Sequence, residues 1–301
     1  MIDIGCGDGC FVEYALHAFA DVLVVGIDLL RRDKVLGRVA RCTEEQRARV
    51  RYIQVDAVLL TPAYLQHLLW ERAGVRLGRV RMVWFSPNCN TLSVALHGSG
   101  VHRSVEHDRP EGEQIRPVSR AAIVDDAVRR RVLDTLSYLA VAYPTACFVV
   151  ENPATGLFCK MPDVLALMQQ PGWRLLRGDH CAMAHTDLDG GVWPKKSTHY
   201  LVFNVRERAC MRRCPGESCR FVIGGTSTHR AQLCARTNML EGQFVLQGWA
   251  RAAVPQGVFD FLWRQRTCEF EPCSTRVDDP EPLRRFYGAT GKFAYSMKEL
   301  K

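Results

Sequence analysis

The sequence predicts an α/β fold with a parallel sheet covered by helices on both faces. Short apolar runs alternate with longer segments of helical periodicity through the first two thirds of the 301-residue chain. Two of these runs, VLVVGID and CFVVEN, are almost continuously apolar, as expected of strands buried on both sides. A glycine-rich turn, DIGCGDG, follows the first run. Together these observations favour a sheet whose strand ends form a ligand site.

The expected elements follow this alternation from the N-terminus. Strands are expected at residues 2–4, 21–28, 50–56, 80–85 and 146–151, and helices at 10–20, 31–41, 62–73 and 121–142. Later segments are two strands at 174–183 and 198–205, a turn-rich stretch with many cysteines, and a helix at 254–264 opened by Pro255. The expected division is a main domain (1–205), a small cysteine-rich region (206–247), a helix returning to the main domain (248–266) and a C-terminal tail (267–301).

Composition bounds the class of protein. Hydrophobic residues make up 47% and charged residues 24%, which is typical of a globular protein. No apolar run is long enough to span a bilayer, and no secretory signal precedes the first strand. We therefore expect an intracellular protein without a membrane partner, in the cytoplasm, or in the nucleus if the source is eukaryotic.

The charge balance favours a nucleic-acid partner. The net charge is +8, and arginine supplies 33 of the 40 basic residues. The planar fork of arginine suits phosphate oxygens and base edges. The alternative is a basic protein from an arginine-rich proteome.

The cysteines suggest a metal site. Thirteen cysteines, an odd number without an export signal, argue against a disulfide framework. The residues that gather in one short segment are Cys210, Cys214, Cys219, His229 and Cys234. Zinc takes four thiolate or imidazole ligands in a tetrahedron, so one structural zinc is a candidate here. Free thiols or a disulfide are the alternatives, because the spacing is not that of the common cysteine pairs.

The glycine-rich turn and two strand-end carboxylates form a candidate cofactor site. The residues of the turn are Asp3, Gly5, Gly7 and Gly9. Glycines let the backbone turn tightly and approach a ligand closely. Asp28 ends the second expected strand, where an acidic side chain can accept hydrogen bonds from ribose hydroxyls. Asp56 ends the third and could meet an adenine amino group. The alternative is a turn that binds another nucleotide, or none.

Two further strand ends carry reactive groups. The fourth expected strand ends in Ser86-Pro87-Asn88-Cys89, and the fifth ends in Glu151-Asn152-Pro153. A thiol is a nucleophile and a carboxyl group an acid or base, and the carboxyl ends of parallel strands meet at one edge. The P-x-C-x-x-x-S and E-N segments resemble the two catalytic motifs of the cytosine-5 DNA methyltransferases. The glycine turn resembles the cofactor loop of Rossmann-like methyltransferases.

This resemblance covers residues 1–204, with a weaker return near Pro255. It implies a Rossmann-like methyltransferase sheet with a small cysteine-rich target-recognition region, S-adenosylmethionine as cofactor and DNA as partner. Ser86 and Pro87 are expected to lie at the cofactor. Cys89 is expected to add to carbon 6 of cytosine, so that carbon 5 can accept the methyl group.

The resemblance also assigns roles to other residues. Glu151 is expected to act at ring nitrogen 3 of the cytosine, and Asn152 to hold Glu151 or its loop. Lys195 and Lys196, in the segment WPKKST, match a basic segment that contacts the target base and phosphate in the family. The family usually has two prolines before its cysteine, valine in place of Pro153 and arginines in place of these lysines.

Other functions remain open from the sequence. Ser86-Pro87-Asn88 partly resembles the motif of enzymes that methylate an exocyclic amino group. RNA as substrate and a catalytically degenerate nucleic-acid-binding protein are further alternatives. Residues 96–120 fall where the family has a mobile active-site loop, and the side chains expected to contact phosphate or fill the gap are His97, His102, Arg103, His107 and Arg109. A disordered polar loop is the other interpretation.

Overall fold

The computed structural model describes the greater part of the chain. The described residues are 1–31, 36–92, 101–106, 114–184, 193–233, 239, 241, 243–245 and 254–267. All of them belong to the first of two compact units, Met1–Cys268. Among the described helices, none is long and apolar enough to cross a membrane.

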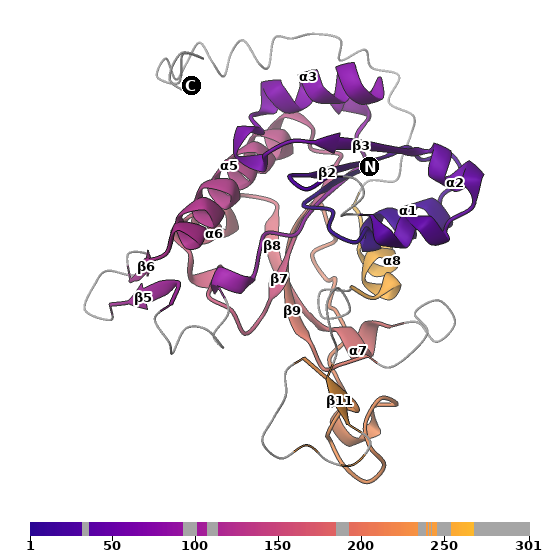
Figure 1. Ribbon diagram of the computed structural model, residues 1–301, viewed down its shortest axis with the longest axis vertical. Helices are drawn as coiled ribbons and strands as arrows, with labels where there is room; N and C mark the ends of the chain where they lie inside the picture. The colour runs from indigo at the N-terminus through magenta and orange to yellow at the C-terminus, as the bar shows by residue number, and fades with distance from the viewer. Residues whose placement is uncertain are drawn as a thin grey trace. The chain divides into compact units, whose positions relative to one another are not determined.

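A mixed sheet of seven strands forms the centre of this unit (Figure 1). The strands are β1 (Ile2–Ile4), β2 (Val24–Asp28), β3 (Val50–Gln54), β4 (Met82–Phe85), β7 (Cys147–Pro153), β8 (Trp173–Asp179) and β9 (Ser197–Phe203). Their order is β3-β2-β1-β4-β7-β9-β8. Neighbours from β3 to β7 are parallel, whereas β9 runs antiparallel to β7 and β8. This arrangement is typical of Rossmann-like methyltransferases, so the predicted fold class is confirmed.

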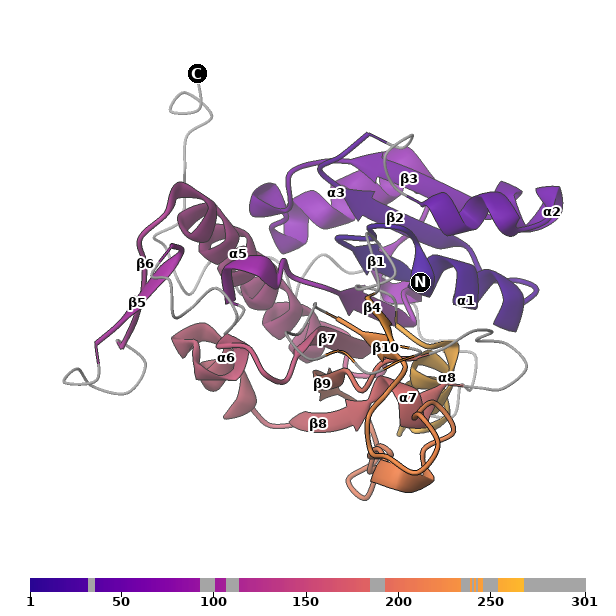
Figure 2. The same cartoon turned by 60° about the horizontal axis from the view of Figure 1, so that its bottom comes forward.

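Helices cover both faces of the sheet, as Figures 1 and 2 show. One face carries α3 (Pro62–Ala73), α5 (Arg120–Ala142) and α6 (Pro162–Met168), and the other carries α1 (Cys10–Ala18) and α8 (Gln256–Arg264). Strand β4 supplies both cores, because Val83 and Phe85 join the first while Met82 and Trp84 join the second. The continuous apolar runs of the sequence follow from this two-sided burial.

The chain returns to the sheet through α8 after the cysteine-rich region. Phe259 of α8 packs 5.5 Å from Phe11 of α1 and 4.6 Å from Trp84 of β4, measured between ring centroids. Pro255 precedes the helix as its N-cap residue. This aromatic packing holds α8 on the same face of the sheet as α1, the helix that follows the glycine turn.

Short elements complete the described fold. They are α2 (Glu44–Ala48), α7 (His180–Met183), the 3-10 helices η2 (Gly37–Arg41), η3 (Ala57–Leu59), η4 (Leu77–Arg79), η5 (Asn90–Leu92), η6 (Phe158–Lys160) and η7 (Gly216–Ser218), and the strands β5 (Arg103–Val105), β6 (Ile115–Pro117), β10 (Ala231–Gln232) and β11 (Phe244–Val245). The hairpin of β5 and β6 lies within the segment for which a disordered loop was one interpretation.

Two expected elements differ from the structure. A helix is expected over 31–41, but the structure has only the short 3-10 helix η2 at the end of this segment. Leu36, directly before η2, has a left-handed backbone conformation (φ 58°). Residues 32–35 lie outside the described residues. The strand expected at 174–183 stops at Asp179 and turns into α7. Asp179 pairs with Ser197, the first residue of β9, so a longer β8 would have no partner strand.

Candidate active site

One row of the sheet aligns the predicted cofactor and catalytic motifs. Across β2, β1, β4 and β7, the paired residues are Ile27, Ile4, Phe85 and Val150. These strands are parallel, so the next residue of each emerges at the same edge. Those next residues are Asp28, Gly5, Ser86 and Glu151. The register of the sheet therefore brings the two sets of motifs to one place.

The glycine turn lies directly against the end of β4. Gly5, Gly7 and Gly9 all have positive φ angles, of 69°, 47° and 86°. A Cβ atom on Gly5 would lie 3.1 Å from the carbonyl oxygen of Ser86. Glycine at this position permits both the left-handed backbone and the close approach of the two chain segments.

Asp28 holds the glycine turn in position. Its Oδ2 accepts a hydrogen bond from the Gly7 N–H (3.1 Å), and its Oδ1 accepts one from the Leu30 N–H (3.0 Å). A carboxylate has about four acceptor positions, so this half-buried side chain keeps capacity for a ligand. Asp56 accepts a hydrogen bond from the Val58 N–H (3.0 Å) and caps η3.

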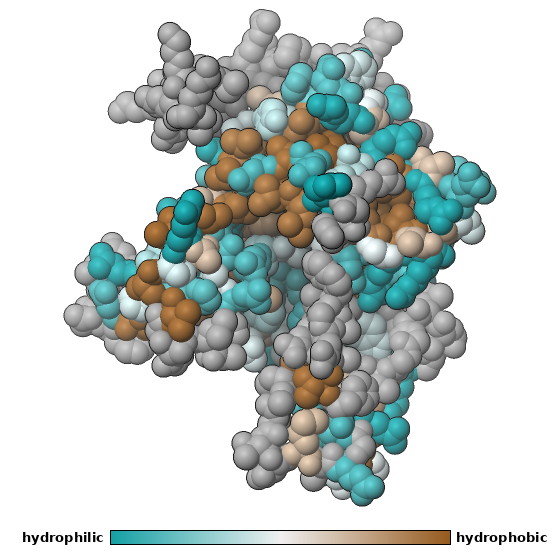
Figure 3. Space-filling model, in the orientation of Figure 1, coloured by the Kyte–Doolittle hydropathy of each residue, from teal (hydrophilic) through white to brown (hydrophobic). Residues whose placement is uncertain are grey.

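Apolar surface lies beside these two carboxylates. Leu29 and Leu30 directly follow Asp28 in the sequence, and their exposed fractions are 60% and 47%. Leu59 follows Asp56 by three positions, and its exposed fraction is 42%. Figure 3 shows apolar surface where Figure 1 places β2 and β3. Such a surface suits the flat face of a base next to its ribose. Sequence reasoning missed these leucines, although two of them directly follow the acidic strand end.

Asp3 lies inside the fold rather than on its surface. Only 2% of the residue is exposed. Burial raises its pKa well above the usual value, and the charges of Asp28 and Asp8 act in the same direction. Asp3 therefore differs from Asp28, whose half-buried carboxylate accepts backbone hydrogen bonds.

Cys89 lies in the loop that follows β4. The Pro87 carbonyl oxygen in this loop accepts a hydrogen bond from Asn152 Nδ2 (3.4 Å), and Ser86 Oγ accepts one from Trp84 Nε1 (2.9 Å). Cys89 is half-buried. Burial raises the pKa of its thiol, Glu151 raises it further, and Lys196 opposes both. Burial and the Glu151 charge therefore disfavour the thiolate, while the Lys196 charge favours it.

Glu151 and Lys196 face one another beside this thiol. Lys196 Nζ lies 3.7 Å from Glu151 Oε1, and both side chains are 8% exposed. Glu151 Oε1 is buried and accepts no hydrogen bond from the residues that the structure describes. The Lys196 ion pair compensates its charge, but at a distance longer than a hydrogen bond, so this atom can still accept a hydrogen bond from a ligand that brings a donor. Lys195 is exposed, and Asn152 is fully buried.

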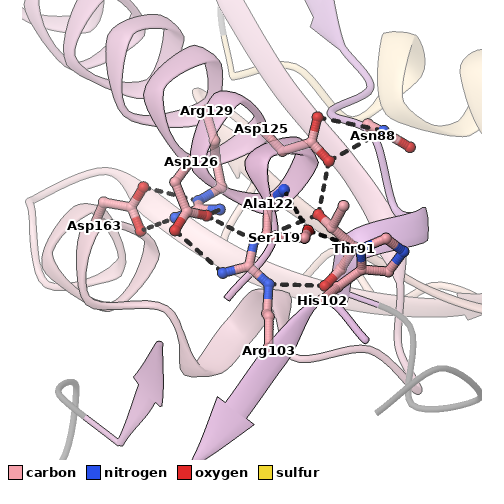
Figure 4. A network of polar contacts seen from close by, with 10 residues as sticks. All are labelled: Asn88, Thr91, His102, Arg103, Ser119, Ala122, Asp125, Asp126, Arg129 and Asp163. Carbon is pink, nitrogen blue, oxygen red and sulfur yellow. Dashed lines mark hydrogen bonds and ion pairs between the residues drawn. The ribbon is translucent and has the colours of Figure 1, made fainter. Parts of the chain in front are cut away.

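The loop around Cys89 is anchored to helix α5 by Asp125 (Figure 4). Asn88 Nδ2 donates to Asp125 Oδ2 (3.1 Å), and Thr91 Oγ1 donates to the same oxygen (2.7 Å). Asn88 Oδ1 in turn accepts the N–H of Asn90 (3.1 Å). Asp125 thus fixes the chain on both sides of the thiol. Sequence reasoning gave it no role, because a charged residue near a helix start usually faces solvent.

A buried ion-pair network lies next to this anchor (Figure 4). Asp126 Oδ1 lies 2.7 Å from Arg103 Nη2 and 2.6 Å from Arg129 Nη1. Arg129 Nε also lies 2.8 Å from Asp163 Oδ2. Burial acts to raise the pKa of Asp126, but the hydrogen bonds and charges of the two arginines outweigh it, so the pKa is lowered.

Arg103 therefore has a different role from the predicted one. It is 1% exposed, and its Nε donates to the Thr91 carbonyl oxygen (2.7 Å) instead of facing a phosphate. His102 contacts Ser119 Oγ through its ring Nδ1 (2.9 Å). The other members of that predicted set, His97, His107 and Arg109, lie outside the described residues.

The cysteine-rich region converges on one cluster. The ligand atoms of Cys181, Cys214, Cys219 and His229 all lie within 4.8 Å of one another, a composition compatible with zinc. Cys210 is exposed and does not belong to the cluster, and Cys234 lies outside the described residues. Sequence reasoning missed Cys181, because it lies far from the others along the chain.

Comparisons with known proteins show only distant likeness. The sequence matches no known protein-family profile and no curated protein sequence. The structure is similar to a 16S rRNA (adenine(1408)-N(1))-methyltransferase from Catenulisporales acidiphilia, at 17% identity over 67% of this chain and 85% of that chain, with a TM-score of 0.37. It is also similar to a mutant of Spodoptera frugiperda DNMT2, at 12% identity over 70% of this chain and 54% of that chain, with a TM-score of 0.37.

The ion-pair network generates a prediction about stability. Replacement Asp126→Ala leaves Arg103 and Arg129 buried without their shared partner, which typically costs about 3–5 kcal/mol. Urea denaturation should show this loss in the free energy of unfolding. The control is Asp260→Ala, which breaks an ion pair with the exposed Arg264 and should cost roughly 0–1 kcal/mol. Equal losses in the two variants would contradict the structural role of the network.

The electrostatics of Cys89 generate a second prediction. Iodoacetamide reacts with thiolates, so the pH profile of alkylation reports the pKa of a thiol. Glu151→Gln removes a negative charge and should shift the Cys89 profile to lower pH. Lys196→Met removes a positive charge and should shift it to higher pH. Peptide mapping by mass spectrometry resolves Cys89 from the exposed Cys210, whose profile should not change. If neither substitution moves the Cys89 profile, the three side chains do not share one site.

Proposed function

We propose that this chain transfers a methyl group from S-adenosylmethionine to carbon 5 of cytosine in DNA, through a transient covalent bond from Cys89. The observation that carries the proposal is the meeting of three side chains: Cys89 in the loop after β4, Glu151 of the adjacent strand β7, and Lys196 directly before β9. The glycine turn after β1 lies against the same edge. A thiol, a carboxylate paired with a lysine, and a glycine turn therefore lie at one edge of the sheet, and this arrangement supports the proposal.

The residues at the end of β2 fit an adenosine group. Asp28 keeps acceptor capacity for ribose hydroxyls beside the positive-φ glycines, and Leu29 and Leu30 offer apolar surface next to it. Ser86, whose carbonyl oxygen lies against Gly5 of the glycine turn, and Pro87 precede Cys89 in the loop after β4. When bound, S-adenosylmethionine supplies an electrophilic methyl group. The chain itself must supply the activated carbon that accepts it.

The chemistry of cytosine explains the reactive residues. Carbon 5 is a weak nucleophile until a thiolate adds to carbon 6, which places electron density on carbon 5. Cys89 forms that bond as its thiol proton passes to the Glu151 carboxylate, which faces ring nitrogen 3 and the adjacent amino group and delivers the proton to nitrogen 3. The amino group supplies the hydrogen-bond donor that Glu151 Oε1 lacks. After methyl transfer, the carbon 5 proton leaves to a general base, the nitrogen 3 proton returns to Glu151, and the Cys89 thiolate is expelled as the ring is restored.

The raised pKa of Cys89 fits a nucleophile that is activated only with substrate in place. In the chain alone, Glu151 disfavours the thiolate, and Lys196 favours it. A bound cytosine that donates a hydrogen bond to Glu151 weakens the effect of the Glu151 charge on the Cys89 thiol. Lys196 then becomes the dominant neighbouring charge, and it stabilises the thiolate.

The geometry supports this function over methylation of an exocyclic amino group. That chemistry needs the polar side chain after β4 to face the amino group. In this chain that side chain is Ser86, whose Oγ accepts a hydrogen bond from Trp84 Nε1 (2.9 Å), and Cys89 stands where the motif has an aromatic ring. Methylation of an amino group also leaves Glu151 and Cys89 without a role.

The cofactor assignment predicts a binding defect. Asp28→Ala should weaken S-adenosylmethionine binding by about 1–3 kcal/mol, because hydrogen-bonding groups of the ligand lose their partner. Isothermal titration calorimetry measures the affinity directly. Asp21→Ala changes an exposed carboxylate before the same strand and serves as the matched control. Unchanged affinity in Asp28→Ala would remove this residue from the site.

The mechanism predicts a trapped covalent complex. Fluorine at carbon 5 of cytosine blocks the final proton removal, so the Cys89 adduct should persist. A pool of oligonucleotides containing 5-fluorocytosine, with S-adenosylmethionine, should give a complex that survives denaturing electrophoresis. Cys89→Ser should abolish trapping, because a hydroxyl group is a far weaker nucleophile at neutral pH. Glu151→Gln should slow it strongly, because the amide cannot supply a proton to the adduct.

Matched controls separate this mechanism from the alternatives. Cys159→Ser changes a half-buried cysteine on η6 and should leave trapping intact. Nucleoside mass spectrometry on DNA and RNA substrates identifies the product: 5-methylcytosine is expected in DNA, and its appearance in RNA alone would change the substrate. A methylated amino group, or equal cytosine methylation by wild type and Cys89→Ser, would refute the proposed mechanism.

A further inference from the structure

Four side chains with metal-ligand chemistry meet at the junction of the cysteine-rich region and the sheet. Their ligand atoms, from Cys181, Cys214, Cys219 and His229, lie within 4.8 Å of one another. Cys181 belongs to α7, directly after β8, whereas the other three lie in the region after β9. Three of the four residues are buried and Cys214 is half-buried, with its Sγ 3.5 Å from His229 Nε2.

The spacing of these atoms suits a tetrahedral metal site. Ligand atoms around zinc, with Zn–S distances of about 2.3 Å, lie about 3.8 Å from one another. The observed limit of 4.8 Å requires only a small contraction. Three thiols and one imidazole form a ligand set typical of structural zinc sites, and soft thiolates disfavour calcium and magnesium.

The surrounding region needs such a crosslink. Its described strands β10 and β11 are two residues long, and its described helical part is one 3-10 turn, η7. The small apolar cluster there is built around the ligands themselves, and its buried members are Cys181, Trp193, Cys219, Phe221 and Val222. Among the described residues this cluster offers little apolar burial, and small loop-rich regions of this kind are commonly stabilised by a metal or another crosslink.

We propose that Cys181, Cys214, Cys219 and His229 bind one zinc ion, and that this ion fixes the segment that holds Lys196 at Glu151. The metal-binding part stands on the ligand geometry alone. The positioning part rests on the proposed function, because it concerns the same Lys196–Glu151 pair.

Asp179 connects the proposed metal site to that pair. It lies two residues before Cys181, and its Oδ2 accepts the Cys214 N–H (2.8 Å) and Arg213 Nε (3.0 Å). Its Oδ1 accepts the hydroxyl group of Ser197. The next residue, His180, donates its N–H to the Lys196 carbonyl oxygen (3.0 Å). Two ligands and the segment 196–197 are therefore joined through one short stretch of chain.

Metal content tests the ligand set. Wild-type protein purified without chelators should contain about one zinc per chain by elemental analysis. Cys181→Ser and His229→Ala should lose it, whereas Cys210→Ser and Cys234→Ser should retain it. His229→Cys keeps a four-ligand set and should also retain zinc, which guards against loss through misfolding. Cobalt substitution should give the thiolate-to-metal absorption of a tetrahedral site in wild type.

Three results would overturn the ligand assignment. The first is wild-type protein without metal. The second is a disulfide among these cysteines in non-reducing peptide maps. The third is loss of zinc in Cys234→Ser with retention in Cys181→Ser. None of these readouts depends on methylation, so failure of the metal site and failure of the proposed function are distinguishable.

Hydrogen exchange tests the positioning role. Removal of the metal by a chelator should speed amide exchange in the peptide that contains Lys196 and Ser197, as well as in the cysteine-rich region. Helix α3, on the far face of the sheet, should not change and is the internal control. Faster exchange confined to the cysteine-rich region would overturn the link to Lys196.

Discussion

The candidate site depends on the register of four parallel strands. Ile4 of β1 pairs with Ile27 of β2 and with Phe85 of β4, and Phe85 pairs with Val150 of β7. A slip of one residue would turn every following side chain to the opposite face of the sheet. With this register, Glu151 lies beside Lys196, while Asn152 donates to the Pro87 carbonyl oxygen. The large apolar side chains on both faces fix this register.

Charge is distributed in two different ways around this edge. The network next to the Cys89 loop is made of ion pairs whose charged groups hydrogen-bond to one another: Arg103 with Asp126, and Arg129 with Asp126 and Asp163. These contacts hold the loop in place, and the carboxylates in them already have donors. Glu151 is buried too, but its Oε1 accepts no hydrogen bond from the described residues. Its charge is compensated by the Lys196 ion pair, and a ligand that brings a hydrogen-bond donor would complete its bonding. The contrast separates the groups that hold the loop from the group that meets a ligand.

The sequence was informative where local pattern and fold class act together. Continuous apolar runs such as CFVVEN identify strands buried on both faces, and parallel strands end at one edge. That reasoning predicts that Cys89 and Glu151 lie at one edge of the sheet, and in the structure the Glu151 charge acts on the Cys89 thiol. It failed for Asp125 and Asp126, since the sequence around them reads as the polar start of a helix. Only the packing of the β5 arginine Arg103 against α5 turns Asp126 inward.

The sequence by itself determined where most strands and helices lie, where the glycine turn lies, and which residues follow the strands. These features depend on the periodicity of apolar residues, on the conformational preferences of each residue, and on the common direction of parallel strands. The tertiary structure decided which distant residues meet. It replaced Cys210 by Cys181 in the cysteine cluster, and it buried Arg103 in an ion-pair network. The physical reason is the same in both cases. Contacts between segments far apart in the chain depend on how β8, β9 and α5 pack, and no local pattern encodes that packing.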